Sequence, residues 1–165
     1  MQTEVQLAPI SPADREEIVD LFNHYVRSSF AAFPDREVPY SFFDLLMEAA
    51  GGYPTLAARD AAGTLIGFGL LRPHHRLPTF ARTAEITCFL APARTRQGLG
   101  SRILEELERQ ARTRGIATLL APISSLNEPS LAFHLKHGFV EAGRFRQIAR
   151  KMGHLFDVVW MQKML

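Results

Sequence analysis

A segment rich in glycine and arginine, residues 94–101, has the composition of a turn that binds a phosphate group. Gly98 and Gly100 let the backbone turn tightly and approach a ligand without a Cβ atom in the way. An amphipathic pattern follows, so the turn is expected to open a helix, whose first N–H groups attract anions. A tight turn without a ligand is the alternative. Nearby positive charge favours the anion site and comes from Arg94, Arg96 and Arg102.

Two well-known phosphate motifs do not fit this turn. A Walker loop has Gly-Lys followed by Ser or Thr, and no lysine follows Gly100. The dinucleotide-binding fingerprint has a third glycine where this chain has Ile103. The ligand is therefore expected to be a different phosphate-bearing molecule.

Two residues are candidates for proton transfer. Glu85 is the only acidic residue between Asp60 and Glu105, and it lies in an otherwise uncharged run, which favours a general base. An outward-facing glutamate on an alternating strand is the alternative. His134 is chemically able to donate a proton near neutral pH, and a packing or surface histidine is its alternative.

The pattern of apolar residues predicts the elements that position these groups. Helical spacing and end signals predict helices that start at Ser11 and that span 41–50, 98–114 and 129–137. Strands are predicted over 54–59, 64–71, 83–90, 116–123, 139–145 and 156–164, with a further strand before the first helix. This order predicts an α/β fold, with a mixed sheet flanked by helices. Without a dividing linker, one domain over residues 1–165 is expected.

Composition narrows the class of protein. The chain has 165 residues and a formal charge of +2, but residues 1–60 carry −6 and residues 61–165 carry +8. The basic half is expected to meet an anionic partner. The alternative is that arginine is merely common in this chain and its charge has no such partner. Cys88 stands alone, which excludes a disulfide framework and a cysteine-based zinc site, and no metal is expected. The start of the chain shows no signal peptide and no apolar run spans a bilayer, so a cytoplasmic protein without a membrane partner is expected.

Several segments together are similar to a known family. The turn matches the pyrophosphate motif Q/R-x-x-G-x-G/A, with Thr95 in the first position and an arginine on each side. The chain resembles the GNAT superfamily of acetyl-coenzyme A-dependent N-acetyltransferases, and within it the phosphinothricin or methionine sulfoximine acetyltransferase branch. That branch usually has tryptophan where Leu155 stands. The segments that carry the resemblance are 23–26, 84–87, 97–101, 127–130, 137–139 and 157–162.

The resemblance implies a fold and a set of roles. The implied fold is a mostly antiparallel twisted sheet of about seven strands with about four helices. Glu85 is implied as the general base, directly or through water, and His134 as the group that assists the departing thiolate. Asn127 and Ser130 are implied to contact the coenzyme, and helix capping is their alternative. The remaining implied coenzyme contacts are Phe89, Leu90, Arg94, Arg96, Gln97, Gly98, Leu99, Gly100 and Ser101.

The acceptor side is less specific. Arg72 and Arg76 lie between two central strands, where they form either an entrance for a carboxylate-bearing amine or a solvated loop. Phe33 either walls the acceptor site or packs in the core. Asp157 matches the branch and is expected to order the acceptor site, with an ordinary strand-end aspartate as the alternative.

The resulting expectation is an acetyl-CoA-dependent enzyme that acetylates the primary amine of a small amino-acid-like molecule, in a homodimer as in the branch. A protein or peptide N-acetyltransferase and a non-catalytic coenzyme A-binding sensor remain alternatives. A nucleic-acid partner is not expected, because Glu105, Glu106 and Glu108 interrupt the basic residues of the long helix.

Overall fold

Residues 4–165, the part of the chain that the computed structural model describes, form one sheet of seven strands in the order β1-β2-β3-β4-β5-β7-β6. The strands are β1 (Gln6–Ala8), β2 (Thr55–Arg59), β3 (Leu65–Pro73), β4 (Thr83–Leu90), β5 (Thr118–Ser124), β6 (Val140–Lys151) and β7 (His154–Met164). The α-helices are α1 (Arg15–Ser28), α2 (Phe42–Ala50), α3 (Leu99–Thr113) and α4 (Glu128–Lys136). Single 3-10 turns lie at η1 (Pro12–Asp14), η2 (Pro78–Phe80) and η3 (Pro92–Arg94). Within this range no helix has the length and apolar character needed to cross a bilayer.

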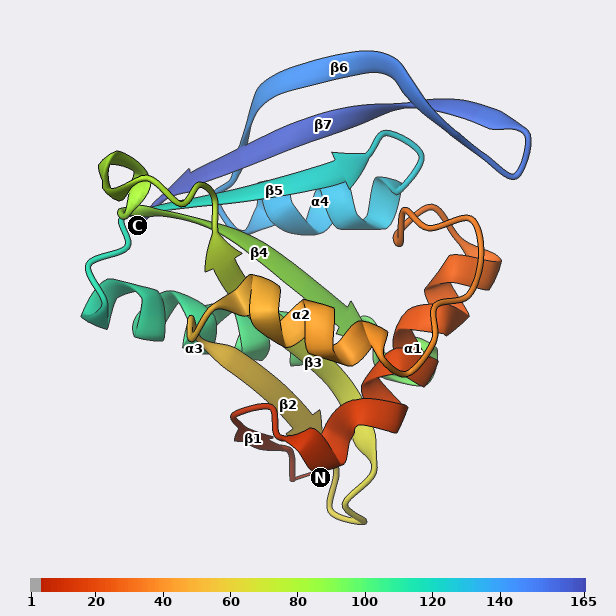
Figure 1. The fold of residues 1–165 in the computed structure, drawn as a ribbon, viewed down its shortest axis with the longest axis vertical. Coiled ribbons are helices and arrows are strands. Elements are labelled where there is room, and N and C mark those ends of the chain that lie inside the picture. Colours follow the sequence, from red (N-terminus) through yellow and green to blue (C-terminus); the bar gives the residue numbers. More distant parts are fainter. Residues whose placement is uncertain (1–3) are drawn as a thin grey trace.

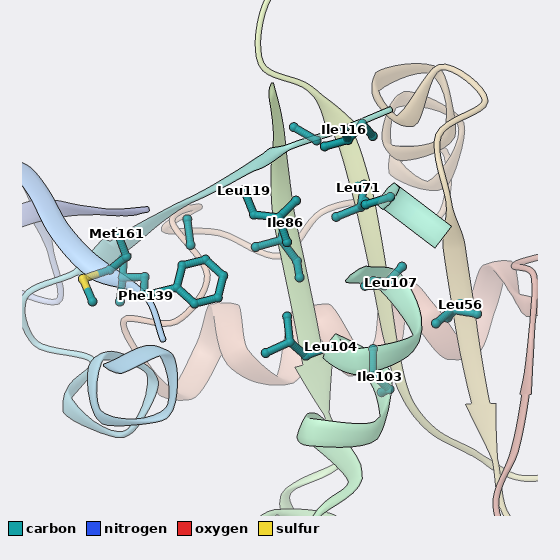
Figure 2. Packing of buried hydrophobic residues seen from close by; sticks show 14 of the residues in the cluster. Leu56, Leu71, Ile86, Ile103, Leu104, Leu107, Ile116, Leu119, Phe139 and Met161 are labelled. Carbon is teal, nitrogen blue, oxygen red and sulfur yellow. The ribbon is translucent and has the colours of Figure 1, made fainter. Parts of the chain in front are cut away.

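The helices cover both faces of the sheet (Figure 1). On one face, the apolar stripe of α3 packs against the strands, and Figure 2 shows Leu104 and Leu107 of this stripe near Ile86 and Leu71. On the other face, α1 and α2 pack against a second cluster that contains Phe89 of β4. Successive residues of a strand point to opposite faces of the sheet. In β4, Ile86 lies on the face covered by α3 and Phe89 on the face covered by α1 and α2. Glu85, like Phe89, therefore lies on the face covered by α1 and α2.

The join between β4 and β5 is the feature that positions the site. It is the one parallel pair among the described strands, and it contains only three residue pairs, which end at Glu85 and Leu120. Beyond Glu85 the two strands diverge (Figure 1). The main chain of residues 86–90 therefore has no β5 partner along that side, whereas β5 pairs with β7 from Thr118 to Ser124.

The predicted mixed fold and its main elements are confirmed. β4 has the predicted bounds, and α2 ends where Gly51 adopts a left-handed conformation (φ +56°). The prediction of β6 was too short, since the strand continues to Lys151. The cause is a bulge between Phe145 and Ala149, where Gln147 has φ +49° and the alternation of side chains is broken. The first helix begins with a 3-10 turn, in which the Asp14 carboxylate accepts a bond from the N–H of Ser11 at 2.7 Å.

Candidate active site

Glu85 lies where β4 and β5 separate, and its carboxylate is held from two sides. Its side chain is only 9% exposed. Arg72, directly opposite on β3, donates from Nε to Oε2 at 3.0 Å and also from Nη2. Nδ1 of His74 lies 2.9 Å from the other oxygen, Oε1. Both carboxylate oxygens are therefore engaged by basic side chains.

The predicted acceptor arginines are in different situations. Arg72 uses its guanidinium to bind Glu85, so its first role in the structure is to hold that carboxylate. Arg76 is exposed, and no hydrogen bond or ion pair ties it to residues 4–165. Arg76 thus carries a charge that is free to meet a ligand.

His134 is half-buried on α4 and is oriented by its own helix. Its Nδ1 lies 2.7 Å from the carbonyl oxygen of Ser130, which can only accept. Nδ1 therefore carries the hydrogen, and Nε2 of the neutral ring can only accept a proton. Burial lowers the pKa of His134, and the bond to Ser130 partly opposes that shift. The ring is consequently neutral at about pH 7, so it has to take up a proton before it can assist a thiolate.

The start of α4 shows the capping role that was the alternative for Asn127. The side-chain oxygen of Asn127 accepts a bond from the N–H of Ser130 at 3.3 Å. Such a bond satisfies one of the free donors at a helix start. A contact of Asn127 and Ser130 with the coenzyme remains a prediction.

The turn before α3 presents free main-chain donors. Arg96 (φ +59°) and Gly98 (φ +82°) both adopt left-handed conformations. The first helical bond runs from the N–H of Arg102 to the oxygen of Gly98 at 3.1 Å, so the N–H groups of 98–101 precede the helical ladder. A Cβ atom on Gly98 would meet no atom within 4 Å, so the space beside this residue is open.

Gly100 serves a different purpose from Gly98. A Cβ atom there would lie 3.2 Å from the Phe133 ring and 3.4 Å from the Leu90 side chain. Gly100 therefore lets α3 begin close to both α4 and β4. Ser101 strengthens the same contact, because its hydroxyl lies 2.8 Å from Nε2 of His137, whose Nδ1 is bound to the Phe133 carbonyl. Leu99 is buried beneath the turn.

Most polar side chains of this turn are already engaged. Arg94 donates to Asp60 in the β2–β3 turn at 3.0 Å, and Arg102 donates to the carbonyl of Val5 at 3.1 Å. Gln97 donates to the carbonyl of Ala93 at 2.9 Å. Arg96 is exposed, with no such partner among residues 4–165. The turn fits a phosphate group through its main-chain donors and Arg96 rather than through all three predicted arginines.

The end of β4 is supported by aromatic side chains. Phe89 is buried against the rings of Phe22, Tyr25 and Phe68. The hydroxyl of Tyr25 donates to the carbonyl oxygen of Leu90. Helix α1 therefore fixes the main chain of β4 at the point where it has separated from β5.

The loop between α1 and α2 lies against the β6–β7 hairpin. Phe33, which is 45% exposed, stacks on Phe156 with ring centres 6.2 Å apart. Lys151 is buried, and its ammonium donates to the carbonyl oxygens of Ser29 at 2.7 Å and Ala32 at 2.6 Å. These hydrogen bonds between the two halves of the sheet were not predicted, because a lysine in a turn-like segment of the sequence gives no indication that it is buried.

Asp157 holds the bulge of β6. Its carboxylate accepts from the N–H of Gln147 at 2.8 Å and from Arg144 at 2.9 Å, and these bonds lower its pKa. Asp157 thus orders the β6 strand, and the role predicted for it in ordering the acceptor site remains a prediction. Leu155 is half exposed.

No group of three or more His, Cys, Asp and Glu side chains in residues 4–165 is arranged to hold a metal ion. The arrangement described above consists instead of a paired carboxylate, a neutral imidazole and a turn with free N–H groups. Proton transfer next to a phosphate-bearing ligand is the chemistry that these groups can support.

Known proteins have sequences similar to this chain. The model of the acetyltransferase (GNAT) family matches residues 18–139. The phosphinothricin N-acetyltransferase of Streptomyces coelicolor is 30% identical over an alignment 169 residues long. This alignment covers 98% of this chain and 97% of that protein. The L-methionine sulfoximine/L-methionine sulfone acetyltransferase of Pseudomonas aeruginosa is 30% identical over 154 residues, which cover 91% and 88%.

A solved structure shows the same similarity. The structure of yncA from Salmonella typhimurium, with its cofactor acetyl-CoA, matches with a TM-score of 0.88 and 28% identity, and the match covers 98% of this chain and 94% of that one. These matches confirm the resemblance that the sequence segments indicated. The chain belongs to the GNAT family of acetyl-CoA-dependent N-acetyltransferases.

Proposed function

We propose that this enzyme transfers the acetyl group of acetyl-CoA to the primary amine of a small amino-acid-like acceptor of the phosphinothricin or methionine sulfoximine type. The observation that carries the proposal is the buried, paired carboxylate of Glu85 at the point where β4 and β5 diverge. The names of the relatives with 30% identity support the acceptor class.

The coenzyme site is proposed along the diverging strands. The N–H groups of 98–101 and the free charge of Arg96 would hold the pyrophosphate, as expected of a helix start. The unpaired side of β4 at Phe89 and Leu90 would bind the pantetheine arm, together with Asn127 and Ser130. Acetyl-CoA supplies the activated thioester carbonyl, and the acceptor amine attacks it directly in a ternary complex.

Glu85 is proposed as the base that draws the proton from the acceptor amine, directly or through an intermediate group such as water. Arg72 and His74 hold its carboxylate in one orientation. His134 would take a proton on Nε2 and return it to the departing sulfur, as its neutral tautomer requires. On the acceptor side, Arg76 would attract the acceptor carboxylate, Phe33 would wall the site, and Asp157 would keep the neighbouring bulge in shape.

We also propose a homodimer in the cytoplasm. β6 is an edge strand whose side chains are exposed over nearly its whole length, and it carries Val140, Phe145 and Ile148 at 55–61% exposure. Long exposed edges of this kind favour pairing with another chain. Sedimentation of the wild-type chain and of Phe145→Asp tests this; a monomeric wild type would contradict it.

A thiol-release screen tests the main proposal. Acetyl-CoA is offered with free amino acids, phosphinothricin, methionine sulfoximine, polyamines and short peptides. Turnover of a small amine is expected, with a loss of about 100-fold or more in Glu85→Gln and retained coenzyme binding. Glu105→Gln, an exposed glutamate on α3, is the control. Activity on peptides alone, or binding without any turnover, would instead indicate one of the two alternatives.

A further inference from the structure

We infer that His74 is the group that receives the proton from the acceptor amine, with Glu85 as its charged partner. This inference rests on the proposed function and assigns the direct proton acceptor within it. His74 is the first residue after β3 and lies in the sequence between Arg72 and Arg76, the two arginines indicated for the acceptor side.

The hydrogen bond between the two side chains fixes which nitrogen of the imidazole carries the hydrogen in the neutral ring. Nδ1 of His74 lies 2.9 Å from Oε1 of Glu85. A carboxylate oxygen accepts, so Nδ1 carries the hydrogen, and Nε2 of the neutral ring keeps its lone pair. Nε2 lies on the opposite side of the ring from Nδ1 and is therefore directed away from Glu85. A histidine held by a carboxylate in this way is the usual arrangement of a general base and its orienting group.

Exposure favours His74 over Glu85 as the direct acceptor. The Glu85 side chain is 9% exposed, and Arg72 and His74 occupy its two oxygens. The His74 side chain is 32% exposed. An amine that approaches from solvent consequently meets the imidazole, whereas the carboxylate lies behind it.

The ring also lies at the right place in the fold. It packs edge-on against Trp160, with ring centres 6.1 Å apart. Trp160 pairs with Pro122 of β5, and Glu85 pairs with Leu120 of the same strand. His74 thus bridges the two halves of the sheet where β4 and β5 begin to separate. Phe80 of η2 packs on another side of the ring at 6.0 Å.

The charges around His74 suit a ring that gains and loses a proton. Glu85 on β4 is the charged group in contact with it, and Arg72 on β3 binds the other carboxylate oxygen. Trp160 and Phe80, the two aromatic rings that pack against it, carry no charge. The imidazolium formed in the reaction would therefore be balanced by a carboxylate in direct contact.

The nitrogen lone pair of the neutral amine forms a bond to the thioester carbonyl carbon, and the bond from that carbon to sulfur breaks. The proton lost by the nitrogen passes to Nε2 of His74. His134 takes up a proton from solvent on Nε2 and gives it to the thiolate, or solvent protonates the thiolate directly, and His74 returns its own proton to solvent.

Two substitutions separate proton transfer from structure. His74→Gln keeps a donor for Glu85 but has no basic nitrogen, and His74→Phe keeps the ring that packs on Trp160. Both are expected to lower kcat by about 100-fold near pH 7, the usual contribution of a general base. Both should also change the pH profile, so that the rate keeps rising with hydroxide concentration and does not level off as in the wild type. His75→Gln is the control, because His75 accepts from the N–H of Leu77 and does not touch Glu85.

The results distinguish the possible failures. A wild-type kcat and a wild-type pH profile in either His74 variant would overturn the inference and leave Glu85 as the direct base. Equal losses in the His75 control would also overturn it, because the effect would then belong to the loop. If the wild type acetylates no amine at all, the proposed function itself fails.

Discussion

Substitution of Gly98 tests whether the turn before α3 needs its left-handed conformation. Gly98 has φ +82°, and the direction of its missing Cβ atom is open. Gly98→Ala therefore introduces no steric contact with the rest of the protein, and its cost is conformational. For a residue with a Cβ atom this cost is about 1–2 kcal/mol. For a chain of this length that corresponds to a fall of about 2–8 °C in Tm. Gly98→Asn should cost less, because asparagine tolerates the left-handed region.

The same substitution is expected to weaken coenzyme binding. If the backbone at position 98 of the variant leaves the left-handed region, the N–H groups of 98–101 no longer point toward the same ligand. Thermal unfolding followed by circular dichroism gives Tm, and calorimetric titration gives the Kd for coenzyme A. Gly63→Ala is a matched control, since Gly63 has φ +81° and open space but lies in the β2–β3 turn. It should lower Tm equally and leave the Kd unchanged.

Two results would refute this reasoning. Equal Tm values for wild type, Gly98→Ala and Gly98→Asn would show that the left-handed conformation at this position is not required. An unchanged Kd for coenzyme A in a destabilised Gly98→Ala would show that the turn does not bind the pyrophosphate.

Three further outcomes are expected. Gly100→Ala should lower the free energy of unfolding in urea by about 1–3 kcal/mol, because its Cβ atom would press on the Phe133 ring at 3.2 Å. Lys151→Met should increase hydrogen exchange of residues 29–32, which lose the donor for two carbonyl groups, whereas Lys163→Met should not. Since burial lowers the pKa of His134 from 6.5, the unfolded chain takes up that proton first. This contribution to the free energy of unfolding is thus present above about pH 6.5 and lost below it. The difference in free energy of unfolding between wild type and His134→Gln should therefore be smaller at about pH 5 than at pH 7.

Local signals were sufficient for most of the fold. The uncharged run around Glu85 predicted β4 with its observed bounds, and the stripe of Ile103 and Leu107 predicted α3. The end of β6 was missed for a physical reason: the bulge at Gln147 interrupts the alternation on which strand prediction depends. That bulge is held by Asp157, a residue of the next strand, so its cause is not local.

The candidate site was only partly predictable. Glu85 stands out in the sequence because it is isolated among uncharged residues. Its partners do not, because the antiparallel register that sets Arg72 opposite it is a tertiary property. Lysine is rarely buried, and Lys151 is buried through carbonyl groups about 120 residues away in the chain. The tautomer of His134 likewise depends on the direction of one carbonyl group, which no sequence pattern reports.

The three-pair join between β4 and β5 has a consequence for engineering. Each half of the sheet comes from one continuous stretch of chain: β1 to β4 with α1 to α3, and β5 to β7 with α4. A chain opened at the exposed Gly115, in the link after α3, would give two fragments whose antiparallel ladders are complete. The apolar core and the bonds of Lys151 to Ser29 and Ala32 also join the halves, so the fragments would reassemble through side chains, and any molecule in contact with both would strengthen their association. If the proposed coenzyme site between β4 and α4 is correct, acetyl-CoA is such a molecule, and association of the fragments would report its concentration.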